Sequence, residues 1–318
     1  MQKIKRIEVI AYDPSWPHIF EAEAELIRQA LGDNYCAVYH IGSTAVPGLA
    51  AKPKIDMITV GKDGNLSIPI LEKIGFTYKG EWNIPFKFGF TKRTENSINL
   101  HVLEEGHPEI EVNLLFRNRL SSNPQSLLRY AKLKEALLKD SASFQKQEGQ
   151  LFTGYTLGKD HFIRTILAQE SYGGQRFLKA THPYEWQSVK LFRDTYFFGP
   201  HDIDDPYTWT FNHEEHSHLV LYQGKEVIDY AHIQFWPNKR AAIRVITIDE
   251  NKRNQNAGSK FLTLIEKWLG RLEIKSIHAE SRQSNLRFYL KNGYTNMAFD
   301  DPENHKSDSH DVAVGKVL

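Results

Sequence analysis

Apolar and polar residues follow a helical or a strand period along most of the first half of the chain. A period of three to four residues predicts helices at about 18–31, 124–138 and 160–170. Alternation with a period of two predicts strands at 35–41, 55–60, 98–103 and 110–116. The first half is therefore expected to mix helices with a sheet.

The pattern breaks most clearly at Gly173-Gly174, which reads as a linker. A new order follows it, with a helix at 186–193, strands at 217–222, 226–236 and 241–248, and a helix after a polar turn. We expect two domains, residues 1–172 and 173–318, each with a mixed α+β or α/β fold.

The composition of the chain limits which partners and which cellular location we expect. The chain has 318 residues, of which 41% are hydrophobic and 25% charged, and its formal net charge is +1. So small a net charge argues against nucleic acid or an anionic membrane as the partner. The single cysteine, Cys36, excludes an internal disulfide. With no apolar signal region and no long apolar run, we expect a cytoplasmic protein that does not span a membrane.

A strand, a polar turn and a helix follow one another at residues 244–269. The strand meets Arg253-x-x-Asn256-x-Gly258, and an apolar helical pattern begins at once. Backbone N–H groups at such a helix start, with the helix dipole, form an anion site. About thirty residues later comes SNLRFYLKNGY, residues 284–294. This pair of motifs resembles the GNAT acetyltransferases, whose turn holds the pyrophosphate of acetyl-CoA. The usual first glycine of that turn is Asn256 here, the non-glycine residue that best tolerates positive φ.

The GNAT resemblance implies acetyl-CoA as the cofactor and an acyl-CoA N-acyltransferase fold. The strand edge would pair with the pantetheine amides, and the turn would bind the pyrophosphate. The expected cofactor contacts are Ile246, Ile248, Arg253, Asn254, Gln255, Asn256, Ala257, Gly258, Ser259 and Asn285. Tyr289 would protonate the departing thiolate, since a phenol of pKa ~10 suits a thiol of pKa ~8.5. The alternative is that Tyr289 is a core aromatic.

The sequence motifs do not single out the general base or the acceptor site. His232 lies in a predicted strand and is a candidate base, beside Asp249, a water chain, or a purely structural role. Residues 199–216 carry carboxylates among aromatic rings, which suits a small cationic primary amine. From this segment we take Asp204, Asp205 and Trp209 as acceptor-site candidates; the alternative is a solvated acidic loop. His213, His216 and His218 lie close together in the sequence and suggest a metal site, but their spacing does not match a reliable set of metal ligands.

A glycine-serine turn marks the first half. HIGSTAVPGL, residues 40–49, leads through AKPK into Ile55-Asp56, the outline of a nucleotidyltransferase fold. The run resembles the GrpB family more closely, together with YDPSW at 12–16, LHV at 100–102 and LLFR at 114–117. The resemblance implies a nucleotidyltransferase-like mixed sheet with a nucleotide or phosphate site. Its expected residues are Gly42, Ser43, Lys54, Asp56, Lys87, His101 and Arg117, with Asp56 as a ligand of Mg²⁺.

Transfer chemistry in that fold requires a second carboxylate near the first. Ile58 stands where the second acid is usual, and His101 or Glu111 are the replacements that the sequence offers. We therefore expect binding of a phosphate-bearing ligand without ordinary two-metal transfer. A domain with nucleotidyl transfer and a domain used only for interaction remain the alternatives.

The combined expectation is an acetyl-CoA-dependent N-acetyltransferase for a primary amine, fused to a GrpB-like domain. Two other interpretations stay open. One is a bifunctional enzyme that acetylates and nucleotidylates an antibiotic, which rests on analogy of fold. The other is a non-catalytic module that binds CoA or a nucleotide.

Overall fold

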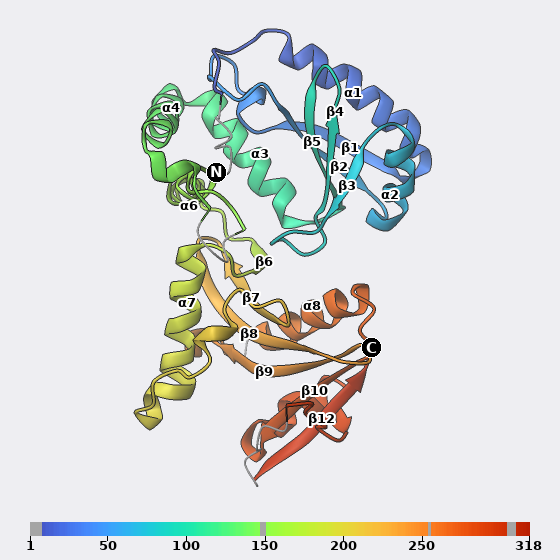
Figure 1. Cartoon of the computed structure of the whole chain (residues 1–318), viewed down its shortest axis with the longest axis vertical. Coiled ribbons are helices and arrows are strands. Elements are labelled where there is room, and N and C mark those ends of the chain that lie inside the picture. The colour runs from blue at the N-terminus through green and yellow to red at the C-terminus, as the bar shows by residue number, and fades with distance from the viewer. Residues whose placement is uncertain (1–7, 147–150, 254–255, 304–309) are drawn as a thin grey trace, which may run out of the picture. The chain divides into compact units, whose positions relative to one another are not determined.

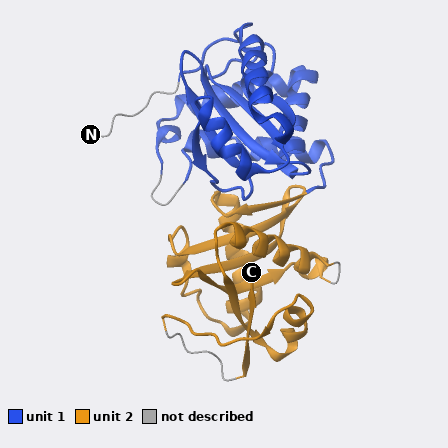
Figure 2. Ribbon diagram, turned by 90° about the vertical axis from the view of Figure 1, so that its right-hand side faces the viewer, with its two compact units in different colours: residues 1–174 blue, residues 175–318 orange. Residues whose placement is uncertain are grey.

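The chain forms two compact units, residues 1–174 and 175–318 (Figure 2). The computed structural model describes residues 8–146, 151–253, 256–303 and 310–318. Each unit has its own mixed sheet with helices packed against it, so the predicted α+β class is confirmed. Across the described residues, no helix combines the length and the apolar character that crossing a lipid bilayer requires.

The sheet of the first unit has five strands in the order β1-β2-β5-β4-β3 (Figure 1). Only the β2–β5 pair is parallel, and its register joins Asp56 to Asn99 and Ile58 to His101. Asp56, Asn99 and His101 therefore lie on one face of the sheet. The strands are β1 (Tyr35–Ile41), β2 (Ile55–Gly61), β3 (Thr77–Gly80), β4 (Phe88–Arg93) and β5 (Ser97–Glu104).

Helices cover both faces of this sheet. Residues such as Ile27, Met57 and Leu100 build the core under the first two helices. Ile58, with Ile110 and Leu114, builds a second cluster on the opposite face. The helices are α1 (Trp16–Leu31), α2 (Gly64–Lys73), α3 (Pro108–Ser122), α4 (Pro124–Lys139), α5 (Gly154–Leu157) and α6 (Asp160–Gln169).

The predicted strand at 110–116 is wrong, because these residues lie inside α3. Pro108 stands at the first turn, where its missing N–H costs nothing, and His107 caps the Glu109 amide. Two acidic residues in the first turn also favour the helix dipole. The apolar alternation arises because the helix packs on two sides. Ile110 and Leu114 contact the sheet cluster, whereas Val112 contacts the cluster around Leu167.

The second unit has a seven-stranded sheet in the order β11-β12-β10-β9-β8-β7-β6. The first four strands of this unit, β6 to β9, form an antiparallel meander, and β10 then joins β9 in parallel. The strands are β6 (Gln175–Lys179), β7 (His216–Gln223), β8 (Glu226–Trp236), β9 (Arg240–Ile248), β10 (Ser276–Arg282), β11 (Thr295–Asn296) and β12 (Asp311–Val317).

Three helices accompany this sheet: α7 (Pro183–Arg193), α8 (Ala257–Arg271) and α9 (Leu286–Lys291). Arg193 at the end of α7 contacts Tyr230 of β8, whereas Trp268 of α8 contacts Phe235 of the same strand. Because side chains alternate along a strand, α7 and α8 cover opposite faces of the sheet. Even-numbered residues of β8 from 230 on thus face α7, and odd-numbered ones face α8.

Strands β9 and β10 separate after a short paired stretch. Their parallel register runs only from Arg240 with Ser276 to Ile243 with Ala279. Beyond it, β9 stays paired with β8 as far as Ile248, and β10 stays paired with β12 as far as Arg282. Among the described residues, the backbone of β9 at residues 244–248 therefore pairs with no other strand on its β10 side.

Candidate functional sites

The end of β9, the start of α8 and helix α9 meet at Gly258. A Cβ atom at this position would lie 2.8 Å from Ile248 Cδ1 and 3.1 Å from Phe288 Cε2. The two sequence motifs, about thirty residues apart in the chain, are thus brought into contact. Only a glycine lets these three elements approach so closely.

Asn256 stands immediately before α8, where the motif usually has its first glycine. Asn256 adopts the left-handed conformation, with φ of 61°, as its tolerance for positive φ allows. The Arg253 side chain donates to the Ile248 carbonyl at 3.2 Å and lies over the Tyr196 ring. Arg253 therefore stabilises the turn. Asn254 and Gln255, the other predicted contacts here, lie outside the described residues.

The residues present fit acetyl-CoA on three observations. The unpaired edge of β9 includes Ile246 and Ile248 and offers backbone groups to an extended arm. The N–H groups of Ala257 to Ser259 begin a helix of 15 residues, which favours a phosphate. Ser259 Oγ is buried and has no hydrogen-bond partner among the described residues. Asn285 lies exposed immediately before α9.

Tyr289 lies in α9 and is 6% exposed. Its ring contacts Phe288 and Tyr294, each at a centroid distance of 5.2 Å. Burial raises the pKa of the Tyr289 hydroxyl above its usual value, so the group stays protonated at neutral pH. Both sequence interpretations, a packed aromatic and a proton donor, agree with this position.

His232 lies on the α7 face of β8, in a cluster of imidazole rings. His216 Nδ1 and His232 Nε2 are 2.9 Å apart, and the His218 ring stacks on His232 at 4.3 Å. Burial, then the charges of His218 and Arg193, lower the pKa of His232 well below its usual value. The ring is therefore neutral at neutral pH, and burial disfavours its protonated form. The described residues contain no group of three or more His, Cys, Asp or Glu arranged to hold a metal.

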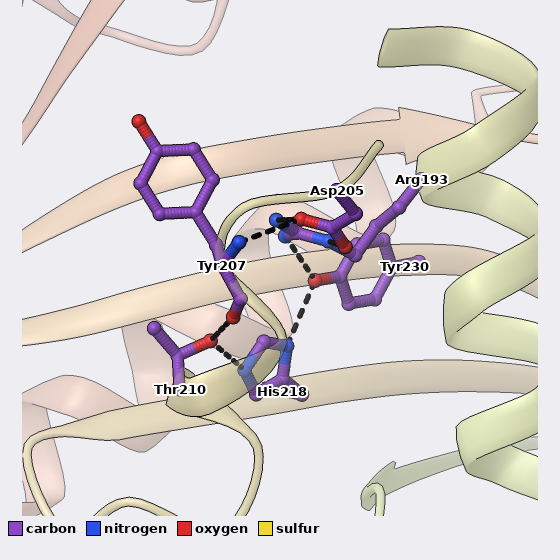
Figure 3. A network of polar contacts seen from close by, with 6 residues as sticks. All are labelled: Arg193, Asp205, Tyr207, Thr210, His218 and Tyr230. Carbon is purple, nitrogen blue, oxygen red and sulfur yellow. Dashed lines mark hydrogen bonds and ion pairs between the residues drawn. The ribbon is translucent and has the colours of Figure 1, made fainter. Parts of the chain in front are cut away.

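A directed chain of hydrogen bonds fastens the segment after α7 to the sheet (Figure 3). Arg193 donates to the Tyr230 hydroxyl at 3.1 Å, and that hydroxyl lies 2.8 Å from His218 Nδ1. Since Arg193 can only donate, the Tyr230 O–H is free to donate to His218. His218 Nε2 then donates to Thr210 Oγ1 at 3.0 Å, and Thr210 donates to the Tyr207 carbonyl at 2.7 Å. Burial lowers the pKa of His218 to about 3, which keeps it in this neutral form.

Asp205, one of the predicted acceptor-site residues, belongs to the same network. Its carboxylate binds the Arg193 guanidinium through two contacts of 2.6 and 2.9 Å and accepts the Tyr207 amide. Arg193 is only 1% exposed, so the pair neutralises a buried cation rather than offering a charge to a substrate. Asp204 and Trp209 stay exposed on the same segment. Arg193 and Tyr230 were missed because nothing in the sequence signals pairing with a residue so far along the chain.

On the opposite face of β8, Asp229 is fully buried and neither carboxyl oxygen has a hydrogen-bond partner in the described residues. It pairs across the strands with Ile248, next to the start of α8. Burial, and then the charge of Asp249, raise the pKa of Asp229 to about 7. Asp229 was not predicted as a site residue, because an acid in a strand is ordinarily solvated.

In the first unit, the glycine-serine turn lies against Asp56. A Cβ atom at Gly42, whose φ is +70°, would lie 2.7 Å from Asp56 Oδ2. Asp56 also accepts a hydrogen bond from Asn99 Nδ2 at 2.8 Å. Burial raises the pKa of Asp56, while the Asn99 bond and the charges of Lys54, Lys159 and Lys87 lower it.

Three lysines that the sequence did not single out as a group lie around this turn. Lys134 Nζ donates to Ser43 Oγ at 3.2 Å and to the Ala50 carbonyl at 2.5 Å. The ammonium groups of Lys52 and Lys159 each lie 4.5 Å from the centre of the Tyr155 ring. Burial, then the charge of a neighbouring lysine, lower the pKa of Lys134 and of Lys159 to about 8. These cations come from the β1–β2 connection, α4 and the residue before α6, so only the fold brings them together.

The remaining predicted residues fall into two groups. Lys87 acts electrostatically on both Asp56 and His101, so these residues lie in one region. Arg117 instead donates to the His40 carbonyl at 2.9 Å and so supports β1 from α3. Glu111 is exposed and lines a separate groove of about 640 Å³ along α3.

This region does not fit Mg²⁺. A magnesium site requires several oxygen ligands, and Asp56 is a single carboxylate surrounded by lysine charges. No group of three or more potential acidic, histidine or cysteine ligands exists in the described parts of the chain. Neither replacement ligand changes this. Glu111 lines the separate groove along α3, and His101 offers a ring nitrogen, whereas Mg²⁺ prefers oxygen ligands.

Comparison with known proteins agrees with both halves of this picture. The GrpB protein family matches residues 6–169, and the Acetyltransferase (GNAT) family matches residues 184–294. The UPF0157 protein BH1888 of Halalkalibacterium halodurans is 40% identical over 134 residues, which cover 41% of this chain and 69% of that protein.

Two solved structures are similar to parts of the chain. Conserved protein GrpB from Enterococcus faecalis is 30% identical, with a TM-score of 0.44, over 58% of this chain and 99% of that one. An aminoglycoside 6′-N-acetyltransferase complexed with coenzyme A is 13% identical, with a TM-score of 0.38, over 44% of this chain and 96% of that one.

Sheet topology, the separated strands and the turn define the second unit as an acyltransferase of the GNAT class, joined to a mixed α+β unit with a lysine-lined turn. The chain belongs to the GrpB family, through its first unit, and carries a GNAT acetyltransferase domain as its second.

Proposed function

We propose that the second unit transfers the acetyl group of acetyl-CoA to a primary amine on a small cationic molecule. The observation that carries the proposal is the meeting of three features at Gly258: the unpaired edge of β9, the start of α8, and α9 with Tyr289. Bound acetyl-CoA supplies an acetyl thioester. The chain supplies backbone donors for the phosphates and an extended edge for the arm.

Two side chains then handle protons. The Tyr289 hydroxyl, held protonated by burial, donates its proton to the leaving thiolate sulfur. The neutral imidazole of His232, with His216 at 2.9 Å, accepts a proton from the attacking amine nitrogen. Asp204 and Trp209, exposed on the segment that Arg193 fastens, attract a cationic acceptor by charge and by the ring face.

The test is thiol release from acetyl-CoA in the presence of single primary amines, including diamines and amino sugars. We expect turnover with cationic amines and none with their N-acetylated forms. Tight binding of acetyl-CoA without consumption by any amine would instead support a non-catalytic CoA-binding module. His232→Gln is expected to reduce turnover and shift its pH profile, whereas a purely structural His232 would change stability alone.

We propose as a second function that the first unit binds a nucleotide or another phosphate-bearing ligand at the glycine-serine turn. The specific observation is the lysine set around Ser43 and Asp56. Nucleotidyl transfer, which the bifunctional alternative requires, is not favoured, because the metal that it uses lacks ligands. The test is calorimetry of the full chain with inorganic phosphate, pyrophosphate and ATP. If none of the three gives a heat of binding, the proposed site does not exist.

A further inference from the structure

The lysine-lined turn of the first unit has cations but lacks their counter-charge. Lys52, Lys134 and Lys159 contact a serine hydroxyl, a carbonyl oxygen and tyrosine rings. None of the three forms an ion pair in the described residues. Partly buried ammonium groups without a carboxylate partner are costly, since burial disfavours the charged form. An anion placed among them would remove that cost.

The cations are arranged around one point. Lys134 and the Tyr130 hydroxyl both reach Ser43 Oγ. Lys159 lies within electrostatic range of Lys134, of Lys52 and of Asp56, and so links the other two lysines. They come from three separate segments, two of them helical or adjoining a helix, and are held by aromatic faces. Such a setting differs from a row of surface lysines, which is solvated and mobile.

The single acid in this setting is too weak a counter-charge. Asp56 is tied to Asn99 at 2.8 Å and touches the Gly42 backbone. Asp56 interacts electrostatically with Lys52 and with Lys159, so one carboxylate faces these two cations. A divalent cation would add repulsion, whereas a group with two or more negative charges would balance the set.

We propose that this turn is a metal-independent binding site for a phosphate or pyrophosphate ester, in which Lys52, Lys134 and Lys159 take the place of Mg²⁺. The proposal rests on the second proposed function and specifies how the ligand is held. Lysine ammonium groups donate to the phosphate oxygens as point charges. Gly42 and Ser43 allow close approach of the backbone. Asp56 acts as a repulsive neighbour that weakens binding.

The test is isothermal titration of the full chain with pyrophosphate in EDTA, and again with Mg²⁺. We expect binding in EDTA that Mg²⁺ does not strengthen. Lys159→Gln and Lys52→Gln are each expected to weaken it by about tenfold or more, because each removes a cation facing the anion. Lys132→Gln, which changes an exposed lysine of α4, is the matched control and should bind as the wild type does. Lys134→Gln is informative only if its melting curve shows a folded protein.

The decisive variant is Asp56→Asn, because the two modes of binding predict opposite signs. In a metal-free lysine site the variant binds pyrophosphate more tightly, by about three- to tenfold, since a repulsive charge has gone. In a metal-bridged site the variant loses binding. Binding that requires Mg²⁺ and Asp56 would overturn the inference and leave the proposed nucleotide site in place. No binding of phosphate, pyrophosphate or ATP under either condition would overturn both.

Discussion

At the scale of single residues, two ionisable side chains of the second unit are buried in opposite settings. Asp229 and Arg193 are both almost fully buried, yet one is unpartnered and the other is held by Asp205. A buried arginine with a bidentate carboxylate costs little beyond its desolvation. A buried carboxyl without partners is stable only as the neutral acid. The two residues therefore respond differently to pH.

Asp229 is expected to make the second unit less stable as the pH rises. Its pKa is about 7 in the folded chain, against about 3.9 for an ordinary aspartate. The folded state thus binds the proton more tightly than the unfolded state. Its contribution is fully present below about pH 4 and is lost as the pH rises through 7. Asp229→Asn should remove this slope, gaining on the order of 1–3 kcal/mol relative to the wild type between pH 5 and 8.

Urea unfolding of both proteins at pH 5, 6.5 and 8 measures this difference. Asp300→Asn, at an exposed position, is the control and should leave the pH dependence unchanged. Parallel curves for the wild type and Asp229→Asn would mean that the carboxyl is solvated or paired in solution.

Tyr289→Phe is expected to reduce turnover by about 10²–10⁴-fold while changing the affinity for acetyl-CoA little. The ring still packs against Phe288 and Tyr294, but the proton donor is gone. The rate of thiol release gives kcat, and calorimetry gives the Kd of acetyl-CoA. The control, Tyr294→Phe, removes a hydroxyl from the neighbouring buried ring and should keep its turnover. Equal turnover in both variants would assign Tyr289 to packing alone.

At the scale of elements, periodicity predicted α1, α4 and α6 in the first unit and several strands of both sheets, and it failed where one helix packs on two sides. The apolar residues from Ile110 to Phe116 alternate because α3 contacts both the sheet and α6. The turn before α8 and the strand feeding it were predictable, because the motif is local. The lysines around Ser43 were not, because α4 and α6 are joined to the turn only by tertiary packing.

Gly258→Val is expected to weaken acetyl-CoA binding by at least about tenfold, because the valine side chain would occupy the space in which the backbone must approach the phosphate. The same side chain would press on Ile248 and Phe288, so some loss of stability accompanies it. Gly270→Ala, in the same helix and with open space around it, is the control. It should bind normally and gain about 0.5–1 kcal/mol of stability. Calorimetry with melting curves separates the two effects, and unchanged affinity in a folded Gly258→Val protein would place the phosphates elsewhere.

At the scale of the whole molecule, each unit has its own sheet and its own buried core. The division at 174/175 lies beside the Gly173-Gly174 break of the sequence. Mixed topology and two domains could be expected from the order of elements. The strand pairing that separates β9 from β10 could not, since register is a long-range property.

Residues 175–318 alone are expected to bind acetyl-CoA with the affinity of the full chain, because every element of the proposed cofactor site lies within them. Calorimetry of the fragment and the full chain compares the two. The control is Gly258→Val in the fragment, which should weaken binding as it does in the full chain. A folded fragment that fails to bind acetyl-CoA would show that the first unit contributes to the site.

The separation of β9 and β10 has a further consequence for how such a unit changes over generations. An edge of backbone amides and carbonyls is present whatever side chains the strand carries, provided that the strand stays extended. Mutations there accumulate at little cost to cofactor recognition. The segment fastened by Arg193 depends instead on five particular side chains in one donor–acceptor order. Sequence divergence in the proposed enzyme would thus preserve acetyl-CoA as the acetyl donor and change which acceptor molecule is bound.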